Sequence, residues 1–165
     1  MKTLRTPLTP AGIQSLREGE QVLLSGIVYT ARDAAHKRLC DLLEAGQPLP
    51  FPLEGSVIFY AGPCPAPPGR VIGSVGPTTS GRMDAYAPRL MQEGFHAMIG
   101  KGPRSPEVID AIRRCGCAYL SAIGGAAALM ARCVERAETV AFEDLGPEAI
   151  VALTVRDLPL IVTNR

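Results

Sequence analysis

Large aromatic side chains are scarce in this sequence. It contains no tryptophan, and only 5% of its 165 residues are aromatic. A core without such rings must be built mainly from alanine, valine, leucine and isoleucine. Because 47% of the residues are hydrophobic, the chain is large enough to bury one such core. We therefore expect a single domain over residues 1–165.

The sequence also lacks an excess of either charge and lacks long apolar runs. Its formal net charge is +1, and its 17 lysines and arginines are spread along the chain, which argues against nucleic-acid binding. No run of about 20 apolar residues could span a membrane. The first residues, MKTLRTP, have no apolar core of a signal peptide. We expect a cytoplasmic protein with neither a nucleic acid nor a membrane as partner.

Signatures of metal binding and of two common enzyme classes are absent as well. The five cysteines are an odd number without a secretory signal, which indicates reduced thiols, and Cys115-Gly-Cys117 alone is weak evidence for a metal. No H-x-x-x-H or C-x-x-C spacing occurs. The absence of G-x-x-x-x-G-K-[ST] excludes a P-loop enzyme, and the absence of G-x-S-x-G argues against a hydrolase.

The middle of the chain alternates between strand and helix patterns, which predicts parallel strands joined by crossover helices. The predicted strands span residues 2–8, 21–30, 56–61, 70–75, 95–99, 117–123, 134–142, 150–155 and 160–163. The predicted helices span residues 10–17, 33–45, 83–93, 106–115 and 126–131, with a helical turn near 147–148. The fold class is therefore α/β, with a mixed, partly parallel sheet, flanking helices and room for a second small sheet at the β-rich ends.

Three local signals sharpen this pattern. Gly26, inside the strand 21–30, indicates a bulge or a close backbone approach. Asp33 is expected to cap the helix that follows it. Pro88 either kinks the helix 83–93 or divides a first turn from it.

Most candidate functional residues follow predicted strands. Ligands of open α/β sheets bind outside the carboxyl ends of the strands. The candidates at such ends are Arg32, Thr78, Thr79, Arg82, Lys101 and Gly124-Gly125. Arginine offers a carboxylate two donors in a fork, and lysine offers a compact charge. This set therefore suits carboxylates or phosphates.

Each candidate also has a plainer interpretation. Arg32 could pair with a surface acid, and Arg82 with Asp84 or Glu93. Lys101 stands between two glycines, where a role in packing is rare.

The hydroxyl and imidazole candidates have plainer interpretations too. Thr78 and Thr79 could cap a helix. His36, four residues after Arg32 on the expected helix, could be an acid–base group because its pKa lies near neutrality. It could equally be an exposed or capping histidine, whereas His96 inside a strand is a structural candidate.

A proline-rich loop lies between the candidate Arg32 and the later candidates that begin at Thr78. Residues 62–69 contain four prolines, which exclude helix and central strand. The loop is either a rigid connector or a functional loop, as a wall of the site or as a partner contact.

Three segments together resemble a known family. They are TARDAAHKR at residues 30–38, GPTTSGRMD at residues 76–84 and IGKG at residues 99–102. These segments resemble the class I fumarase and L(+)-tartrate dehydratase family, in its C-terminal domain or separate β subunit. The resemblance extends from about Thr6 to Thr163, and its most specific part is the segment 76–84.

The resemblance implies a fold, a cofactor and a partner. The fold would be a swivelling β/β/α domain. A separate α subunit would carry a [4Fe–4S] cluster on three cysteines, with one iron open to substrate as a Lewis acid. No metal or cofactor would be bound by this chain itself.

The resemblance also implies roles for individual residues. Arg32, Arg82 and Lys101 would hold the substrate carboxylates, and Thr78 and Thr79 stay substrate-binding candidates from their place in the segment 76–84. Thr78 would lie close to the carbon that gains or loses a proton, and His36 matches a position treated as acid–base. Threonine is a poor base until neighbours activate it, so either Thr78 or His36 could handle the proton.

The function expected from these observations is that of a β subunit of a hydro-lyase for a C4 dicarboxylate, active only with its α subunit. Fumarate/malate is the first choice of substrate and tartrate/oxaloacetate the second. One alternative is a stand-alone dicarboxylate-binding or interaction domain without activity. Another is an unrelated enzyme that uses Cys64 or His36 as nucleophile or base.

Overall fold

A single sheet connects the strands of residues 1–122 and 127–165, which are the residues that the computed structural model describes. The strands are β1 (Lys2–Arg5), β2 (Gln21–Thr30), β3 (Val57–Phe59), β4 (Ala97–Gly100), β5 (Ala118–Ala122), β6 (Val134–Ala141) and β7 (Ile150–Asn164). Their order is β1-β2-β3-β4-β5-β7-β6, and β2 also pairs with β7. The pairing therefore closes into a circuit from β2 through β3, β4, β5 and β7 back to β2. The β-rich ends join this same sheet, so the second small sheet for which the sequence left room does not form among the described residues.

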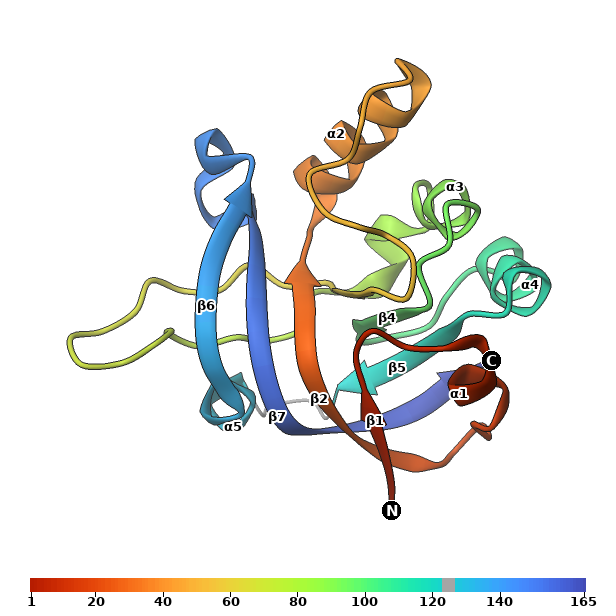
Figure 1. The fold of residues 1–165 in the computed structure, drawn as a ribbon, viewed down its shortest axis with the longest axis horizontal. Helices are drawn as coiled ribbons and strands as arrows, with labels where there is room; N and C mark the ends of the chain where they lie inside the picture. Colours follow the sequence, from red (N-terminus) through yellow and green to blue (C-terminus); the bar gives the residue numbers. More distant parts are fainter. Residues whose placement is uncertain (123–126) are drawn as a thin grey trace.

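Parallel and antiparallel pairings are both present, as the sequence predicted. β1, β2, β3, β4 and β5 pair in parallel, and β7 runs antiparallel to β2, β5 and β6. The α-helices are α1 (Pro10–Gln14), α2 (Asp33–Glu44), α3 (Ala87–Met91), α4 (Pro106–Cys115) and α5 (Ala127–Arg132), with 3₁₀ turns η1 (Ser80–Met83) and η2 (Glu143–Glu148). Figure 1 shows α2, α3 and α4 in a row beside the parallel strands that they connect.

Among the parallel strands, β3, β4 and β5 are buried on both faces, whereas β1 and β2 keep exposed positions. Phe59 of β3 belongs to a core cluster that all five strands of the circuit share, so this cluster fills the interior of the circuit. The neighbouring Ile58 belongs to a second cluster, formed with residues of α2, α3 and α4. Burial on both faces explains why these strands show continuous apolar runs rather than alternation.

Helix ends follow the local signals closely. The Ser105 side chain accepts a hydrogen bond from the amide of Val108, and Gly116 ends α4 in the left-handed conformation. Pro88 lies in the first turn of α3, which divides this helix from η1. Most other elements begin or end a few residues from their predicted limits. Among the described residues, no helix has both the length and the apolarity to cross a membrane.

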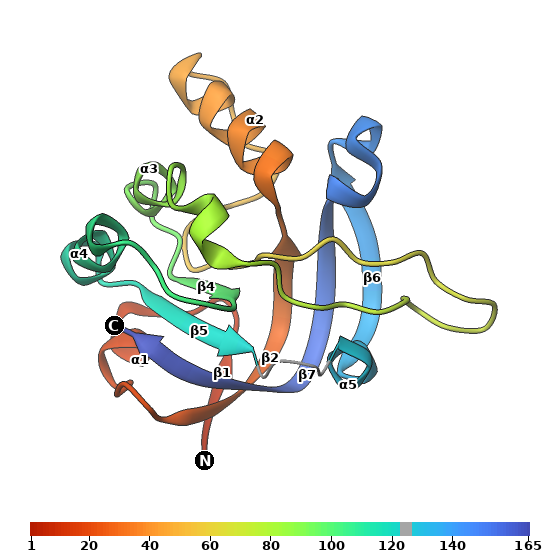
Figure 2. The same ribbon diagram turned by 180° about the vertical axis from the view of Figure 1, so that it is seen from behind.

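The predicted strand 70–75 is wrong. Residues 62–75 form an irregular double-stranded projection, here called the arm, that extends past β6 (Figure 2). Its two sides are joined by the amide of Cys64, which donates to the Ser74 carbonyl, and by the amide of Gly73, which donates to the Cys64 carbonyl. Prolines flank Cys64 and have no amide hydrogen, so a regular ladder cannot extend from these bonds.

The predicted strands 150–155 and 160–163 are one continuous strand, β7. Pro159 lies between them, in a section where β2 is the only strand of the described residues in register with β7: β6 pairs up to Val155 and the described part of β5 pairs from Leu160. A proline is tolerated where one side of a strand is unpaired, because its missing amide hydrogen then costs no ladder bond.

The bulge expected at Gly26 is confirmed and gives a stability prediction. The β2–β7 register shifts between Leu24 and Gly26, and a Cβ added to Gly26 would lie 2.1 Å from the Thr6 Oγ1. Gly46 also has positive φ, 67° against 111° at Gly26, but has open space around it, so it is a control for a left-handed glycine without a close neighbour. We expect Gly46→Ala to cost about 1–2 kcal/mol from backbone strain alone. Gly26→Ala should cost roughly 1–3 kcal/mol more from overpacking, as measured by urea unfolding. Equal costs would contradict the close approach.

Candidate functional site

Residues 76–84, here called the site turn, lie against the carboxyl ends of β3 and β4. The Thr78 amide donates to the carbonyl of Tyr60, which directly follows β3, at 2.6 Å. The Ser80 amide donates to the Lys101 carbonyl at 2.9 Å, and Thr79 forms an isolated parallel bridge with Lys101. The site turn therefore reaches the strand ends although no strand precedes it, contrary to the sequence-based placement of Thr78, Thr79 and Arg82.

The amino end of α2 is joined to the site turn by an ion pair. The Nε and Nη2 of Arg82 both lie 3.0 Å from the Asp33 Oδ2. The alternative pairing of Arg82 with Asp84 or Glu93 is therefore wrong, since those acids pair with Arg104 and Arg89.

The expected helix cap at Asp33 is wrong too. Asp33 is the first residue of α2, and Arg32 occupies the N-cap position without a side-chain capping bond. The Glu148 Oε1 instead accepts from the Ala34 amide at 3.3 Å. Asp33 is thus free to orient Arg82, a role that the sequence did not reveal.

Arg32 follows β2 and lies at the base of the arm. A Cβ added to Gly62 would lie 3.1 Å from the Arg32 Cδ and 3.2 Å from its Nη1. The Arg32 Nε is buried and has no hydrogen-bond acceptor among the described residues. The Asp33 Oδ1 is also buried and has no hydrogen-bond donor among them. Buried polar atoms are nearly always paired, so each such atom requires an explanation.

Lys101 directly follows β4, as predicted, and it is exposed. The Thr79 side chain is exposed as well and makes no capping bond to η1, while Thr78 is partly buried. The remaining candidate at a strand end, Gly124-Gly125, lies outside the described residues.

His36 is buried rather than exposed, with 1% of its surface accessible. Its Nδ1 lies 2.8 Å from the Arg32 carbonyl, which can only accept, so Nδ1 carries the hydrogen. The ring lies beside the rings of Tyr60 and Tyr86, at centroid distances of 5.3 Å and 6.1 Å. Burial, the largest cause, together with the charge of Arg104 lowers the pKa of His36 from 6.5 to about 4, although the Arg32 carbonyl and Asp33 act in the opposite direction. The imidazole is therefore neutral at pH 7.

A buried arginine beneath the site was missed by sequence reasoning. The Arg104 side chain is 0% exposed, and its Nε donates to the Asp84 Oδ1 at 2.8 Å. The available signal was weak: Asp84 closes the segment 76–84, and Arg104 directly precedes the Ser105 cap.

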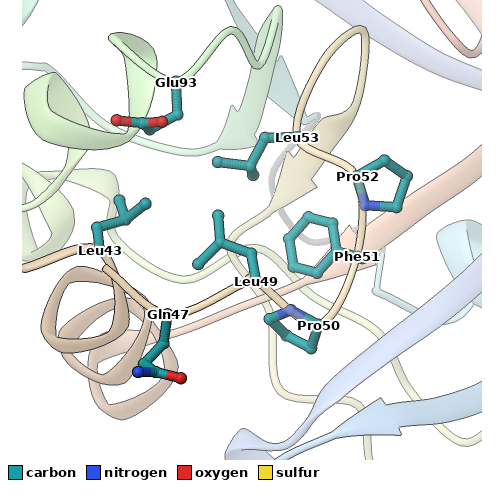
Figure 3. A pocket seen from close by; sticks show the side chains of 8 residues that line it. All are labelled: Leu43, Gln47, Leu49, Pro50, Phe51, Pro52, Leu53 and Glu93. Carbon is teal, nitrogen blue, oxygen red and sulfur yellow. The ribbon is translucent and has the colours of Figure 1, made fainter. Parts of the chain in front are cut away.

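Other features of the described residues lie apart from this edge. The pocket in Figure 3 is lined by Leu43, Gln47, Leu49, Pro50, Phe51, Pro52, Leu53 and Glu93, at the opposite end of α2 from Arg32. Cys64 is exposed on the arm, and its described contacts give it no basic partner. No group of three His, Cys, Asp or Glu side chains in residues 1–122 and 127–165 could hold a metal ion.

Comparison with known proteins shows the family to which this sequence is similar. The family model described as Fumarase C-terminus matches residues 2–164. "Fumarate hydratase class I, anaerobic" of Escherichia coli K12 is 43% identical over 141 residues, which are 84% of this chain and 26% of that protein. "Fumarate hydratase 2" of Leishmania major is 40% identical over 146 residues, which are 87% of this chain and 26% of that protein. The chain thus spans about a quarter of the length of these relatives.

A relative of another type has nearly the same length as this chain. "Putative L(+)-tartrate dehydratase subunit beta" of Methanocaldococcus jannaschii is 39% identical over 161 residues. The match covers 94% of this chain and 83% of that protein.

The burial of His36 predicts a pH-dependent stability. In the unfolded chain its pKa is about 6.5, whereas the folded pKa is about 4. Between these values the unfolded chain binds more protons, so the free energy of unfolding falls as the pH falls through this window. Relative to His36→Asn, the wild type should lose about 2–3 kcal/mol between pH ~7 and pH ~4.5 in urea titrations. Parallel pH curves for the two proteins would show that His36 is not buried as described.

Proposed function

The chain belongs to the Fumarase C-terminus family, as its three segments indicated, and on that premise we propose that it is the β subunit of a hydro-lyase. It would add water to, or remove water from, a C4 dicarboxylate, with fumarate/malate as the first candidate and tartrate/oxaloacetate as the second. The names of its relatives, a fumarate hydratase and a tartrate dehydratase subunit, support this reaction class.

One observation carries the proposal: three cations from three separate segments lie at one edge of the sheet. Arg82 pairs with Asp33, which neighbours Arg32, and the site turn bonds to the Lys101 backbone. The Arg32 Nε has no acceptor in the described structure. A dicarboxylate presents two anionic groups, so it can occupy this edge and pair with more than one cation.

The same arrangement favours the chemistry of a hydro-lyase. Removing a proton next to a carboxylate builds negative charge on that carboxylate. Fixed cations aimed at it stabilise the transition state more than the ground state. The contribution of Arg32, Arg82 and Lys101 would therefore be both binding and catalysis, with Thr79 beside them.

The proton step is proposed for Thr78 rather than His36. The His36 ring is almost fully buried behind the Arg32 carbonyl, and its low pKa makes protonation costly. Thr78 belongs to the site turn and is partly exposed at the edge that carries the cations. His36 would instead hold the backbone of Arg32, while neighbouring groups would have to activate the Thr78 hydroxyl.

A partner chain completes the proposed enzyme. The relatives named fumarate hydratase are about four times as long as the matched segment, and the relative of similar length is named as a subunit. The described residues of this chain do not fit an iron–sulfur cluster. We therefore propose that an α subunit holds the [4Fe–4S] cluster, and no step is assigned to it here. A swivelling motion and a cytoplasmic location stay predictions from the sequence.

A second candidate function is a dicarboxylate-binding domain without activity. The exposed cations favour it, because an anion could bind at this edge without any other chain. Such a domain would bind succinate yet gain no activity from an α subunit.

Replacing a site cation should abolish most activity without unfolding the chain. With the α subunit present, we expect Arg82→Ala and Lys101→Ala each to lower kcat/KM by about 10²–10³, the usual effect of losing one group that stabilises an oxyanion. Arg114→Ala is a matched control, since Arg114 is an exposed arginine paired with Asp110 on α4. Circular dichroism would check folding. Near-normal turnover by both site variants would contradict the assignment.

A further inference from the structure

The residues beneath the site form a buried polar network around Arg104. Its guanidinium lies between two aromatic rings, at 5.1 Å from the Tyr60 centroid and 4.9 Å from that of Tyr119. The Nη2 donates to the Tyr60 hydroxyl at 3.2 Å, and the Nε donates to Asp84. Arg104 thus contacts Tyr60 after β3, Tyr119 of β5 and Asp84 at the end of the site turn.

Asp84 connects the end of the site turn to the start of α4. Its Oδ1 accepts from Arg104, and its Oδ2 accepts from the Ser105 amide at 2.8 Å. Both carboxylate oxygens of Asp84 are therefore paired. Asp84 lies two positions after Arg82, so these two bonds fix the chain close to Arg82.

Tyr119 holds the loop that carries Lys101. Its hydroxyl donates to the Gly102 carbonyl at 2.8 Å and lies 2.8 Å from the Ser80 Oγ, so the Ser80 hydroxyl donates to it in turn. The Ser80 amide donates to the Lys101 carbonyl. The Lys101 carbonyl is thus bonded to the site turn, and the next carbonyl, that of Gly102, is bonded to the Tyr119 side chain.

Close packing makes this junction specific. A Cβ added to Gly100 would lie 1.9 Å from the Ser80 Oγ and 2.9 Å from the Tyr60 Cδ2. Ser80 can approach the end of β4 only because Gly100 has no side chain.

We infer that Ser80, Asp84, Arg104 and Tyr119, here called the support network, position Lys101 and Arg82 relative to each other for one substrate. These four residues are positioning residues, since they lie below the exposed cations. The inference rests on the proposed function, because the substrate is taken to be a dicarboxylate held by both cations.

Energetics favours positioning over stability as the role of the network. A buried ion pair is often no more stabilising than apolar residues of similar volume, although removing one partner is costly. Lys101 and Arg82, by contrast, lie on short turns with exposed side chains. A displacement of about 1 Å at a site can cost about 10²-fold in rate, so fixing these turns has a large effect.

Tyr119→Phe tests the inference because it removes one oxygen and keeps the ring on Arg104. Tyr29→Phe is the matched control: its ring stacks on Phe51 at 4.2 Å, away from the network. In the enzyme assembled with its α subunit, we expect Tyr119→Phe to raise KM for fumarate and to lower kcat/KM by about 10–100-fold. The control should keep wild-type values. A purely structural role would reduce the active fraction and leave KM unchanged.

A second variant and a second measurement complete the test. Arg104→Lys keeps the charge but loses the fork, so it should also raise KM. Titration of the chain alone with succinate measures its affinity for a dicarboxylate without catalysis. Tyr119→Phe should weaken this affinity. If the wild-type assembly turns over no C4 dicarboxylate while Tyr119→Phe still weakens succinate binding, the proposed reaction fails and the positioning role stands. If Tyr119→Phe matches Tyr29→Phe in both KM and succinate affinity, the positioning role is overturned.

Discussion

Two backbone hydrogen bonds hold the site turn against the sheet, and the rest of the site depends on them. The amides of Thr78 and Ser80 donate to the carbonyls of Tyr60 and Lys101. Without a preceding strand, these bonds replace the ladder that would normally carry a turn to the edge of a sheet. The buried ion pair of Arg104 and Asp84 lies directly beneath and fixes the end of the same turn. The spacing of the cations at this edge follows from these few contacts.

Much of this arrangement could be predicted from local sequence signals. Arg32 and Lys101 were placed correctly because each follows an apolar strand within two residues. The cap at Ser105 and the glycine at 116 are likewise local features. The resemblance to the fumarase family was confirmed by a match over residues 2–164. The swivelling motion, the single-domain organisation and the roles of the individual site residues stay predictions.

The failures of prediction share a physical cause, which is contact between distant segments. Arg82 pairs with Asp33 across 49 positions, and Asp84 pairs with Arg104 across 20, and neither pair leaves a periodic pattern in the sequence. Residues 70–75 have the composition of a strand, but their neighbour in space is rich in proline and cannot supply a ladder. His36 is buried beside Tyr60 and Tyr86, which both come from outside its own helix.

We propose that this chain provides the carboxylate-binding half of a shared active site. The most direct measurement is anaerobic reconstitution of the purified chain with a cluster-bearing α subunit, followed by the disappearance of fumarate and of tartrate. We expect that neither chain alone has activity and that the mixture hydrates fumarate or dehydrates tartrate. Activity of this chain alone, or a mixture that binds dicarboxylates without converting any of them, would show that the active site is not shared in this way.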